Sequence, residues 1–251
     1  MQHLTILTGA SRGMGLAIAQ QLCAADALVL CISRGKAPAL DAVARERGAS
    51  LTQWQADLAD PAPLAARLRD WLAQQDAAQM RSATLINNAG VVGGTGPLDG
   101  CDASAISMAL RVDLEAPMQL TAAFLAATYQ WMLPRKVLNI SSGLGRRPMA
   151  GGALYCAAKA GMDHFSRSVA LDEALRTQGA RIVSLAPGVI DTDMQGDLRA
   201  GDTGHFPERD NFVRMKAAGA LTSPADAAKR ILVYLAREDF GSLPVADVRD
   251  A

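Results

Sequence analysis

Tyr155 and Lys159 are the residues of this chain that are best suited to acid–base chemistry. Four residues apart, they lie on one face of a helix, about one turn from each other. The lysine charge favours the phenolate, and one charge at ~4 Å shifts a pKa by up to about 3 units when the effective dielectric is roughly 20. We therefore expect Lys159 to lower the pKa of Tyr155 from about 10 into the working range of neutral pH.

A serine pair at residues 141–142 comes shortly before this helix. The preceding run, residues 136–140, predicts a buried strand that ends at the two hydroxyls. Ser142 at the strand tip would face the tyrosine and the lysine, which makes the three a suitable group for carbonyl chemistry. A Y-x-x-x-K spacing alone is common, and its plainer interpretation is a packed tyrosine beside a solvated lysine. The surrounding elements decide between the two interpretations.

Short apolar runs alternate with helical patterns along the whole chain. This alternation predicts an α/β fold, a single doubly wound Rossmann-type domain over residues 1–251, with helices on both faces of a parallel sheet. A long polar stretch, residues 193–220, is predicted to have no regular secondary structure. Strands are expected at residues 4–7, 28–33, 51–55, 84–86, 136–140, 181–185 and 243–247, and helices at 16–25, 38–47, 61–78, 103–131, 155–176 and 224–237.

Chemically interesting residues follow the predicted strands, at the point where each strand ends. Ligands of such sheets bind beyond the carboxyl ends of the strands. The agreement between the positions of these residues is stronger support for a binding site than any one motif. The residues concerned are Gly9, Arg34, Asp57, Asn88, Ser142 and Pro187.

Three glycines, Gly9, Gly13 and Gly15, lie between the first strand and the first helix. Small residues let the backbone turn tightly and approach a pyrophosphate at the helix N-terminus, where free N–H groups and the helix dipole favour anions. The alternative is a plain tight turn. We expect the whole turn to bind a dinucleotide, including Ser11, Arg12 and Met14.

The tip of the second strand predicts which dinucleotide binds. An NAD site places an acid there to hold the ribose 2′-hydroxyl, but this chain reads Ser33-Arg34 and has no acid until Asp41. Arg34 and Arg12 could bind a 2′-phosphate, so the sequence favours NADP(H). After the third strand, Asp57-Leu58 is expected to contact the adenine, with a turn cap as the alternative role of the aspartate.

With these motifs in place, the chain resembles the short-chain dehydrogenases/reductases from end to end. The resemblance rests on T-G-x-x-x-G-x-G at 8–15, N-N-A-G at 87–90, Ser142 thirteen residues before Tyr155, Lys159, and Pro187-Gly188 with Thr192. It implies that Tyr155 is the proton donor, that Ser142 polarises the carbonyl, and that Lys159 binds the nicotinamide ribose. It also implies that Asn88, Ala89 and Gly90 support the cofactor, and that Ile190 and Thr192 hold the carboxamide.

One position departs from the pattern of the family. Where a helix of the family usually carries a catalytic-relay Asn, this chain has Asp113, whose carboxylate cannot donate the amide's hydrogen bond. Pro117 follows four residues later and has no N–H for the carbonyl of residue 113. We infer that the backbone role survives and that the side-chain role is altered, through a protonated or water-bridged carboxyl.

Three segments are similar to the sepiapterin reductases and the bacterial benzil reductases within this family, at residues 153–157, 186–195 and 239–247. This resemblance implies a bulky aromatic or heteroaromatic ketone or diketone as substrate. It also implies that Asp247 accepts hydrogen bonds from a pterin, with Asp250 as the fallback. The alternative for Asp247 is an exposed tail carboxylate paired with Arg249. A benzil-type diketone reductase, a general ketoreductase and a non-catalytic NADP(H)-sensing protein stay open as alternative functions.

Composition limits the kinds of partner that this protein can be expected to bind. The formal net charge is zero, so no global basic field exists for nucleic acid or anionic lipid, and we expect neither partner nor a membrane span. The four cysteines and three histidines show no ligand spacing, which predicts a cytoplasmic protein without a metal. Residues 193–220 are expected to form a substrate lid or else a solvated loop. The family resemblance implies a homodimer or homotetramer.

Overall fold

The computed structural model describes residues 1–202 and 204–250, and within them one parallel sheet of seven strands runs in the order β3-β2-β1-β4-β5-β6-β7. All neighbouring strands pair in parallel, as expected when a helix connects each strand to the next. The strands are β1 (Gln2–Thr8), β2 (Ala27–Ser33), β3 (Ser50–Gln55), β4 (Met80–Asn87), β5 (Arg135–Ile140), β6 (Arg181–Ala186) and β7 (Val245–Asp247).

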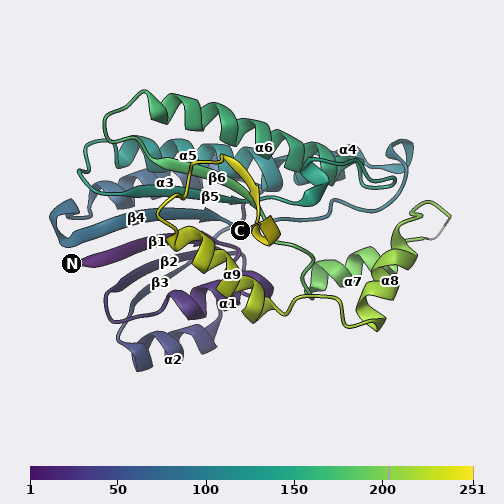
Figure 1. The fold of residues 1–251 in the computed structure, drawn as a ribbon, viewed down its shortest axis with the longest axis horizontal. Helices are drawn as coiled ribbons and strands as arrows, with labels where there is room; N and C mark the ends of the chain where they lie inside the picture. Colours follow the sequence, from purple (N-terminus) through teal and green to yellow (C-terminus); the bar gives the residue numbers. More distant parts are fainter. Residues whose placement is uncertain (203, 251) are drawn as a thin grey trace.

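Helices cover both faces of the sheet (Figure 1), which confirms the predicted fold class. One face carries α1, α2 and α9, and the other carries α3, α4, α5 and α6. Two further helices, α7 and α8, lie beyond the carboxyl ends of the strands. The helices are α1 (Gly13–Leu22), α2 (Pro38–Arg47), α3 (Pro61–Ala73), α4 (Ala103–Leu110), α5 (Ala116–Ala127), α6 (Ala153–Ala174), α7 (Asp193–Ala200), α8 (Arg209–Ala217) and α9 (Pro224–Ala236).

The sheet separates two hydrophobic cores, because successive side chains of a strand point to opposite faces. On β2, Leu30 and Ile32 pack into the core beneath α3 and α5, whereas Val29 and Cys31 pack into the core beneath α1, α2 and α9. Strands buried on both faces read as continuous apolar runs, which is why these segments could be located in the sequence.

The order in which strands are added to the sheet reverses at β1. From β1 the chain builds outward through β2 and β3, and then returns to place β4 on the other side of β1. The loops after β1 and β4 therefore diverge, and a crevice opens between them at the carboxyl edge of the sheet. The glycine-rich turn and the Asn88 segment lie at this crevice.

Two segments differ from the predicted secondary structure. The expected helix 103–131 is α4 and α5 joined by a π-helical turn, η3 (Arg111–Glu115). The expected irregular stretch 193–220 contains α7 and α8. Its apolar residues Leu198, Phe206 and Phe212 are buried in a third cluster with Val92 and Met149, and this packing stabilises helices that the glycines and charges of the segment obscured.

No helix among the described residues is long and apolar enough to cross a membrane. Within the same part of the chain, no group of three or more histidine, cysteine, aspartate or glutamate side chains could hold a metal ion.

Gly15, the third glycine of the turn, allows the closest approach of backbone in this region. A β-carbon on Gly15 would lie 2.0 Å from the carbonyl oxygen of Gly9 and 2.5 Å from Nδ2 of Asn88. Neither neighbour can retreat easily, because the Asn88 amide donates to the Thr8 carbonyl oxygen at 2.9 Å. The turn, the first helix and the β4 loop are therefore held together only if residue 15 has no side chain.

Replacing Gly15 with alanine should lower the free energy of unfolding by about 1–3 kcal/mol, the usual cost of overpacking, and should weaken cofactor binding. Thermal unfolding and cofactor titration measure the two effects. Gly100→Ala is the matched control, since a β-carbon there meets no atom within 4 Å. Equal stability of the two variants would contradict the close approach at Gly15.

Candidate active site

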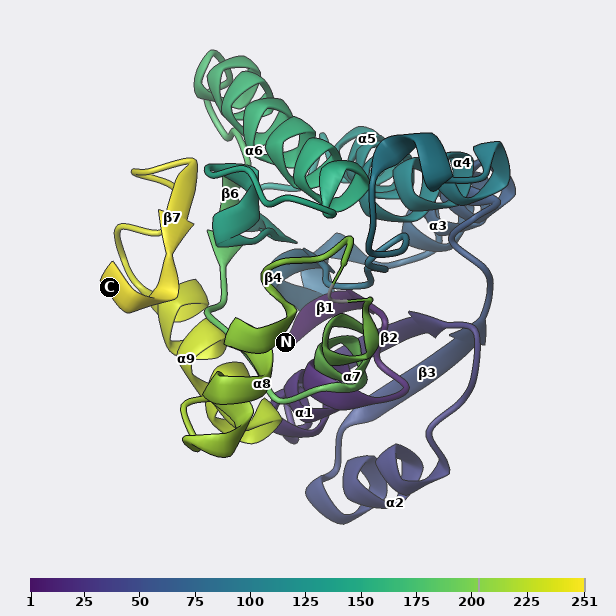
Figure 2. The same cartoon turned by 90° about the vertical axis from the view of Figure 1, so that its right-hand side faces the viewer.

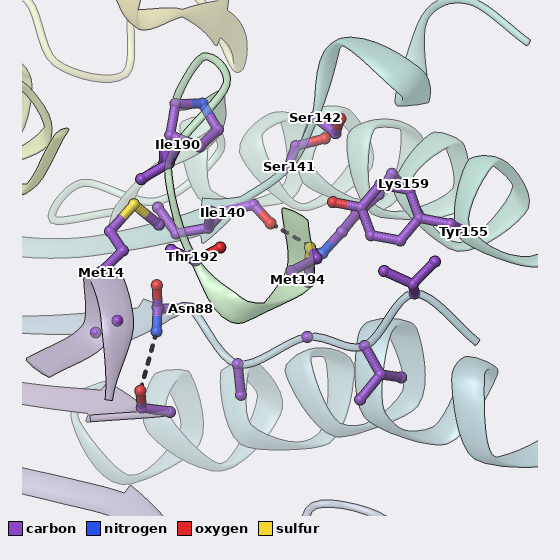
Figure 3. Close-up of a pocket in the computed structure, with 18 of the residues that line it drawn as sticks. Met14, Asn88, Ile140, Ser141, Ser142, Tyr155, Lys159, Ile190, Thr192 and Met194 are labelled. Carbon is purple, nitrogen blue, oxygen red and sulfur yellow. Dashed lines mark hydrogen bonds between the residues drawn. The ribbon is translucent and has the colours of Figure 1, made fainter. Parts of the chain in front are cut away.

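A cavity of about 410 Å³ opens at the carboxyl edge of the sheet. Figure 3 shows that its wall is formed by the turn at Met14, the Asn88 loop, the end of β5, the start of α6 and the segment from Ile190 to Met194. All the residues predicted to contact cofactor or substrate line this one cavity, whereas Asp113 lies outside it. The predicted residues are Gly9, Ser11, Arg12, Gly13, Met14, Gly15, Ser33, Arg34, Asp57, Leu58, Asn88, Ala89, Gly90, Ser142, Tyr155, Lys159, Pro187, Gly188, Ile190, Thr192 and Asp247.

Helix α6 carries the tyrosine and the lysine on one face, as their spacing predicted. The Lys159 ammonium lies 5.4 Å from the centroid of the Tyr155 ring and donates a hydrogen bond to the Ile140 carbonyl oxygen at 3.1 Å. Only 4% of Lys159 is exposed. Because Ile140 is the last residue of β5, this bond holds α6 against the strand end that leads into Ser142 (Figure 3).

Ser142 begins a short 3₁₀ turn, η4 (Gly143–Gly145). Its Oγ accepts from the Leu144 N–H at 3.1 Å, as a capping hydroxyl does. The bond uses a lone pair of the hydroxyl, so its proton stays available for an acceptor in the cavity.

The structure corrects the expected pKa of Tyr155. Burial raises this pKa more than the Lys159 charge lowers it, while Asp113 raises it further and a hydrogen bond from Ser142 lowers it. The pKa therefore lies above its ordinary value and does not approach neutrality. The prediction was wrong because it counted the charge of Lys159 without the desolvation of the phenol.

Asp113 lies in the π-helical turn, beneath the cavity. Its Oδ1 accepts from the Val91 N–H at 2.8 Å, and its buried Oδ2 meets no hydrogen-bond partner within the described residues. Lys159 lies on the same side, since a β-carbon on Gly90 would be 3.2 Å from Asp113 Oδ1 and 3.5 Å from Lys159 Nζ. Burial raises the pKa of Asp113, although the Lys159 charge and the Val91 bond lower it. These directions favour the protonated carboxyl among the alternatives inferred above.

Thr8, the last residue of β1, was given no role of its own by the sequence reasoning. Its buried hydroxyl accepts from the backbone N–H groups of Asn88 and Ala89, at 2.9 Å and 3.0 Å. These bonds fix the β4 loop to the glycine-rich turn. A threonine directly before the first glycine was the only available signal.

The cofactor end of the cavity contains two arginines, of which one is paired with a carboxylate and the other is not. Arg12 donates to Asp193 on α7 at 2.8 Å, whereas Arg34 is exposed and has no carboxylate within 4.0 Å among the described residues. Arg34 is therefore the more available partner for a 2′-phosphate.

Asp57 caps a turn in this structure. Its Oδ1 accepts from the Ala59 N–H at 3.0 Å, which is the role given above as the alternative to contact with the adenine.

Asp163, on α6 one turn after Lys159, is a buried carboxylate that the sequence analysis missed. Its Oδ1 accepts from the hydroxyls of Ser141 and Ser184 at 2.6 Å and 2.7 Å, and its Oδ2 lies 3.3 Å from Nε of Arg146. Asp163 therefore positions the segment that carries Ser142. An aspartate four residues after the lysine, on the same helix face, was the signal for it.

Asp247 lies at the end of β7 and is paired with Arg249. The guanidinium donates to Oδ1 through Nε at 2.8 Å and to Oδ2 through Nη2 at 2.6 Å, and the Arg249 N–H donates to Oδ1 at 3.0 Å. This is the pairing that the sequence left open as the alternative to substrate binding. That alternative assumed an exposed tail, however, whereas Asp247 is buried, with only 7% of it exposed, and lines the cavity.

Comparisons with known proteins agree with this geometry. A family model described as short chain dehydrogenase matches residues 3–203. The benzil reductase ((S)-benzoin forming) of Bacillus cereus is 35% identical over 235 residues, 94% of each chain. The sepiapterin reductase of Meriones unguiculatus is 33% identical and covers 98% of this chain and 95% of its own. A solved putative NAD(P)-dependent gluconate 5-dehydrogenase from Beutenbergia cavernae, with bound NADP, has a TM-score of 0.82 at 27% identity and covers 98% and 94% of the two chains.

Replacing Asp113 with asparagine should stabilise the protein increasingly as pH rises. A native carboxyl with a raised pKa keeps its proton where the unfolded chain has lost it, so wild-type stability falls between the ordinary pKa and the raised one. Asparagine does not titrate. The stability difference between variant and wild type should therefore grow across this window, by about 1.4 kcal/mol for each unit of pKa elevation.

Urea denaturation of both proteins at several pH values from about 4 to 8 measures this difference. A difference that does not change with pH would contradict a raised Asp113 pKa. The variant should also keep or raise activity, because it restores the residue usual in the family. A large loss of activity would show that the carboxyl group itself is required.

Proposed function

Since the chain belongs to the short-chain dehydrogenase family, we propose that this oxidoreductase is an NADPH-dependent carbonyl reductase of bulky aromatic or heteroaromatic ketones and diketones. One observation carries the proposal. Ser142, Tyr155 and Lys159 line the same cavity as the glycine-rich turn. A cofactor held by the turn would therefore reach the acid–base group.

The glycine-rich turn fits a dinucleotide. Gly9 and Gly13 have positive φ angles of 72° and 54°, and the N-terminus of α1 opens onto the cavity. This arrangement suits the phosphates of a nicotinamide cofactor, the class of cofactor that the family binds. When bound, such a cofactor supplies the hydride for the carbonyl carbon. Asn88 to Gly90, Ile190 and Thr192 are proposed to hold its nicotinamide end.

In the proposed reduction, the Ser142 hydroxyl donates to the substrate oxygen and Tyr155 gives it a proton. The raised pKa of Tyr155 suits this task, because the phenol is fully protonated at neutral pH before the reaction. Lys159 then stabilises the phenolate that remains. Asp113 and Asp163 act through these residues, by fixing the Val91 loop and the Ser141 segment.

The choice of NADP(H) rests on the tip of β2. Ser33 and Arg34 line the cavity there, and no acid is present to hold a free 2′-hydroxyl. An exposed, unpaired guanidinium suits a phosphate, which it can bind through two parallel hydrogen bonds.

The substrate class rests on the relatives and on the cavity. Both sets of curated relatives are named as reductases, of benzil and of sepiapterin. We favour the benzil-type diketone, because the carboxylate that would accept from a pterin, Asp247, already accepts from Arg249. Sepiapterin is the second candidate, since Asp247 lines the cavity. A non-catalytic NADP(H)-sensing protein is disfavoured by the complete serine, tyrosine and lysine set.

We propose that α7 and α8, within residues 193–220, form a lid over the substrate. Met194, Gln195, Leu198 and Phe212 from this region line the cavity, and Arg12 joins the start of α7 to the cofactor turn. A single domain over residues 1–251 and a homodimer or homotetramer remain predictions.

The purified protein should oxidise NADPH when benzil is added, and Tyr155→Phe should lose most of this turnover, about 100-fold or more, because only the acid is removed. The absorbance of NADPH reports the rate, and a fluorescence titration checks that the variant still binds NADPH. A panel containing sepiapterin and a simple aryl diketone tests the substrate class. Wild-type-like turnover by Tyr155→Phe would refute its assignment as the acid.

Arg34→Asp should weaken NADPH at least tenfold, since the substitution removes a phosphate partner and adds a like charge. NADH should be affected much less. The KM and Kd of both cofactors, for wild type and variant, measure the difference. If both cofactors weaken equally, Arg34 does not bind the 2′-phosphate.

A further inference from the structure

One wall of the cavity ends in a chain of charged side chains, of which the proposed reduction uses only Asp163, as a positioning residue. It runs from Asp163 through Arg146 and Asp247 to Arg249. Strand β7, which carries Asp247, lies beside β6 at the edge of the sheet (Figure 2). This chain of contacts therefore joins the segment after Ser142 to the last residues that the structure describes.

Arg146 is engaged away from the cavity. Its Nε lies 3.3 Å from Asp163 Oδ2, its Nη2 donates to the Ala246 carbonyl oxygen at 2.7 Å, and its Nη1 lies 3.8 Å from Asp247 Oδ2. It does not line the cavity. Arg146 thus fixes β7 to the Ser142 segment and supplies part of the charge that Asp247 needs.

The carboxylate of Asp247 has little capacity left for a ligand. Its Oδ1 accepts two hydrogen bonds from Arg249, and its Oδ2 accepts a third at 2.6 Å and faces Arg146. Arg249 holds the pKa of Asp247 below its usual range. A substrate that donates to Asp247 would find one acceptor site left on Oδ2, beside a bidentate arginine, which is among the stronger pairings in proteins.

Two guanidinium groups of the cavity wall keep N–H groups for a ligand: Arg249 uses Nε and Nη2 on Asp247 and keeps Nη1, and Arg147 keeps its whole guanidinium. Arg147 and Arg249 both line the cavity. Arg147 is exposed and has no carboxylate within 4.0 Å among the described residues. Of the acids that line the cavity, Asp193 faces Arg12, Asp247 faces Arg249, and Asp57 follows β3 at the cofactor end. Asp250 is near enough to raise the pKa of Arg249 but does not line the cavity.

We propose that Arg147 and Arg249 bind an anionic oxygen group, such as a carboxylate, carried by the aromatic substrate, and that Asp247 positions Arg249 for this contact. The proposal rests on the carbonyl-reductase function and narrows its substrate class. The cavity then offers donors at both ends of the ligand, with the Ser142 and Tyr155 hydroxyls for the carbonyl and the guanidinium groups for the acid. A pterin, which presents N–H donors, fits this end less well.

The test compares three matched compounds, namely benzil, benzil with a carboxylate para on one ring, and the methyl ester of that acid. With NADPH, the wild type should prefer the acid to the ester by about tenfold or more in kcat/KM, the range of a charge-assisted hydrogen bond. Arg147→Gln should reduce this ratio toward one, and Arg147→Glu should invert it. The preference should also fall as salt is added.

Arg230→Gln is the control, since it removes an exposed arginine of α9 that does not line the cavity. It should keep the wild-type ratio. Arg249→Gln removes the bidentate partner of Asp247 and leaves only Arg146, at 3.8 Å, beside that carboxylate. It is therefore made together with Asp247→Asn, and thermal unfolding checks that the double variant folds. The double variant should also lose the preference for the acid.

A wild-type ratio of one or less, or a ratio that Arg147→Gln does not change, overturns the proposal. Preference for sepiapterin over all three compounds also overturns it and returns substrate recognition to Asp247. Absence of turnover on every compound is instead a failure of the carbonyl-reductase function. In that case, calorimetry measures the Kd of the acid and of the ester for the enzyme with NADP⁺, in wild type and in Arg147→Gln. The ratio of the two Kd values then decides this proposal in the same way as the kcat/KM ratio.

Discussion

The bond from the Lys159 ammonium to the Ile140 carbonyl oxygen is the contact on which the rest of the site depends. It joins α6 to the last residue of β5, so the tyrosine of the helix and the serine after the strand face one cavity. A buried ammonium needs such an acceptor, because an unpaired charge in this environment would be costly. The same lysine lowers the pKa of Asp113 and of Tyr155 against the effect of burial, and in the proposed reduction it would stabilise the phenolate of Tyr155.

Much of this arrangement follows from the sequence, since strands buried on both faces must be apolar and the motifs must lie at the strand ends. The cofactor turn, Ser142 and the face shared by Tyr155 and Lys159 were therefore predictable. The π turn at Asp113 was not, because the local pattern is that of an ordinary helix. The pKa of Tyr155 and the pairing of Asp247 depend on burial and on tertiary contacts, which residue spacing does not encode.

The two ends of the cavity differ in their charged groups. At the end proposed for the cofactor, the N-terminus of α1 and Arg34 line the cavity and suit phosphates, and Arg12 is joined to α7, the proposed lid. At the other end, Arg146 and Arg249 neutralise Asp163 and Asp247, and Arg147 is left over. Between the two ends, the reacting groups are neutral hydroxyls beside a buried ammonium, which is the state required before a carbonyl is reduced.

The central claim is that hydride from a nicotinamide cofactor and a proton from Tyr155 reach the same carbonyl group. Reduction of benzil in ordinary water, with NADPH that carries deuterium at both C4 positions, tests it most directly when the product is analysed by mass spectrometry. The account predicts one deuterium on the carbinol carbon of the wild-type product, and little labelled product from Tyr155→Phe under the same conditions. A product without deuterium on that carbon would contradict it.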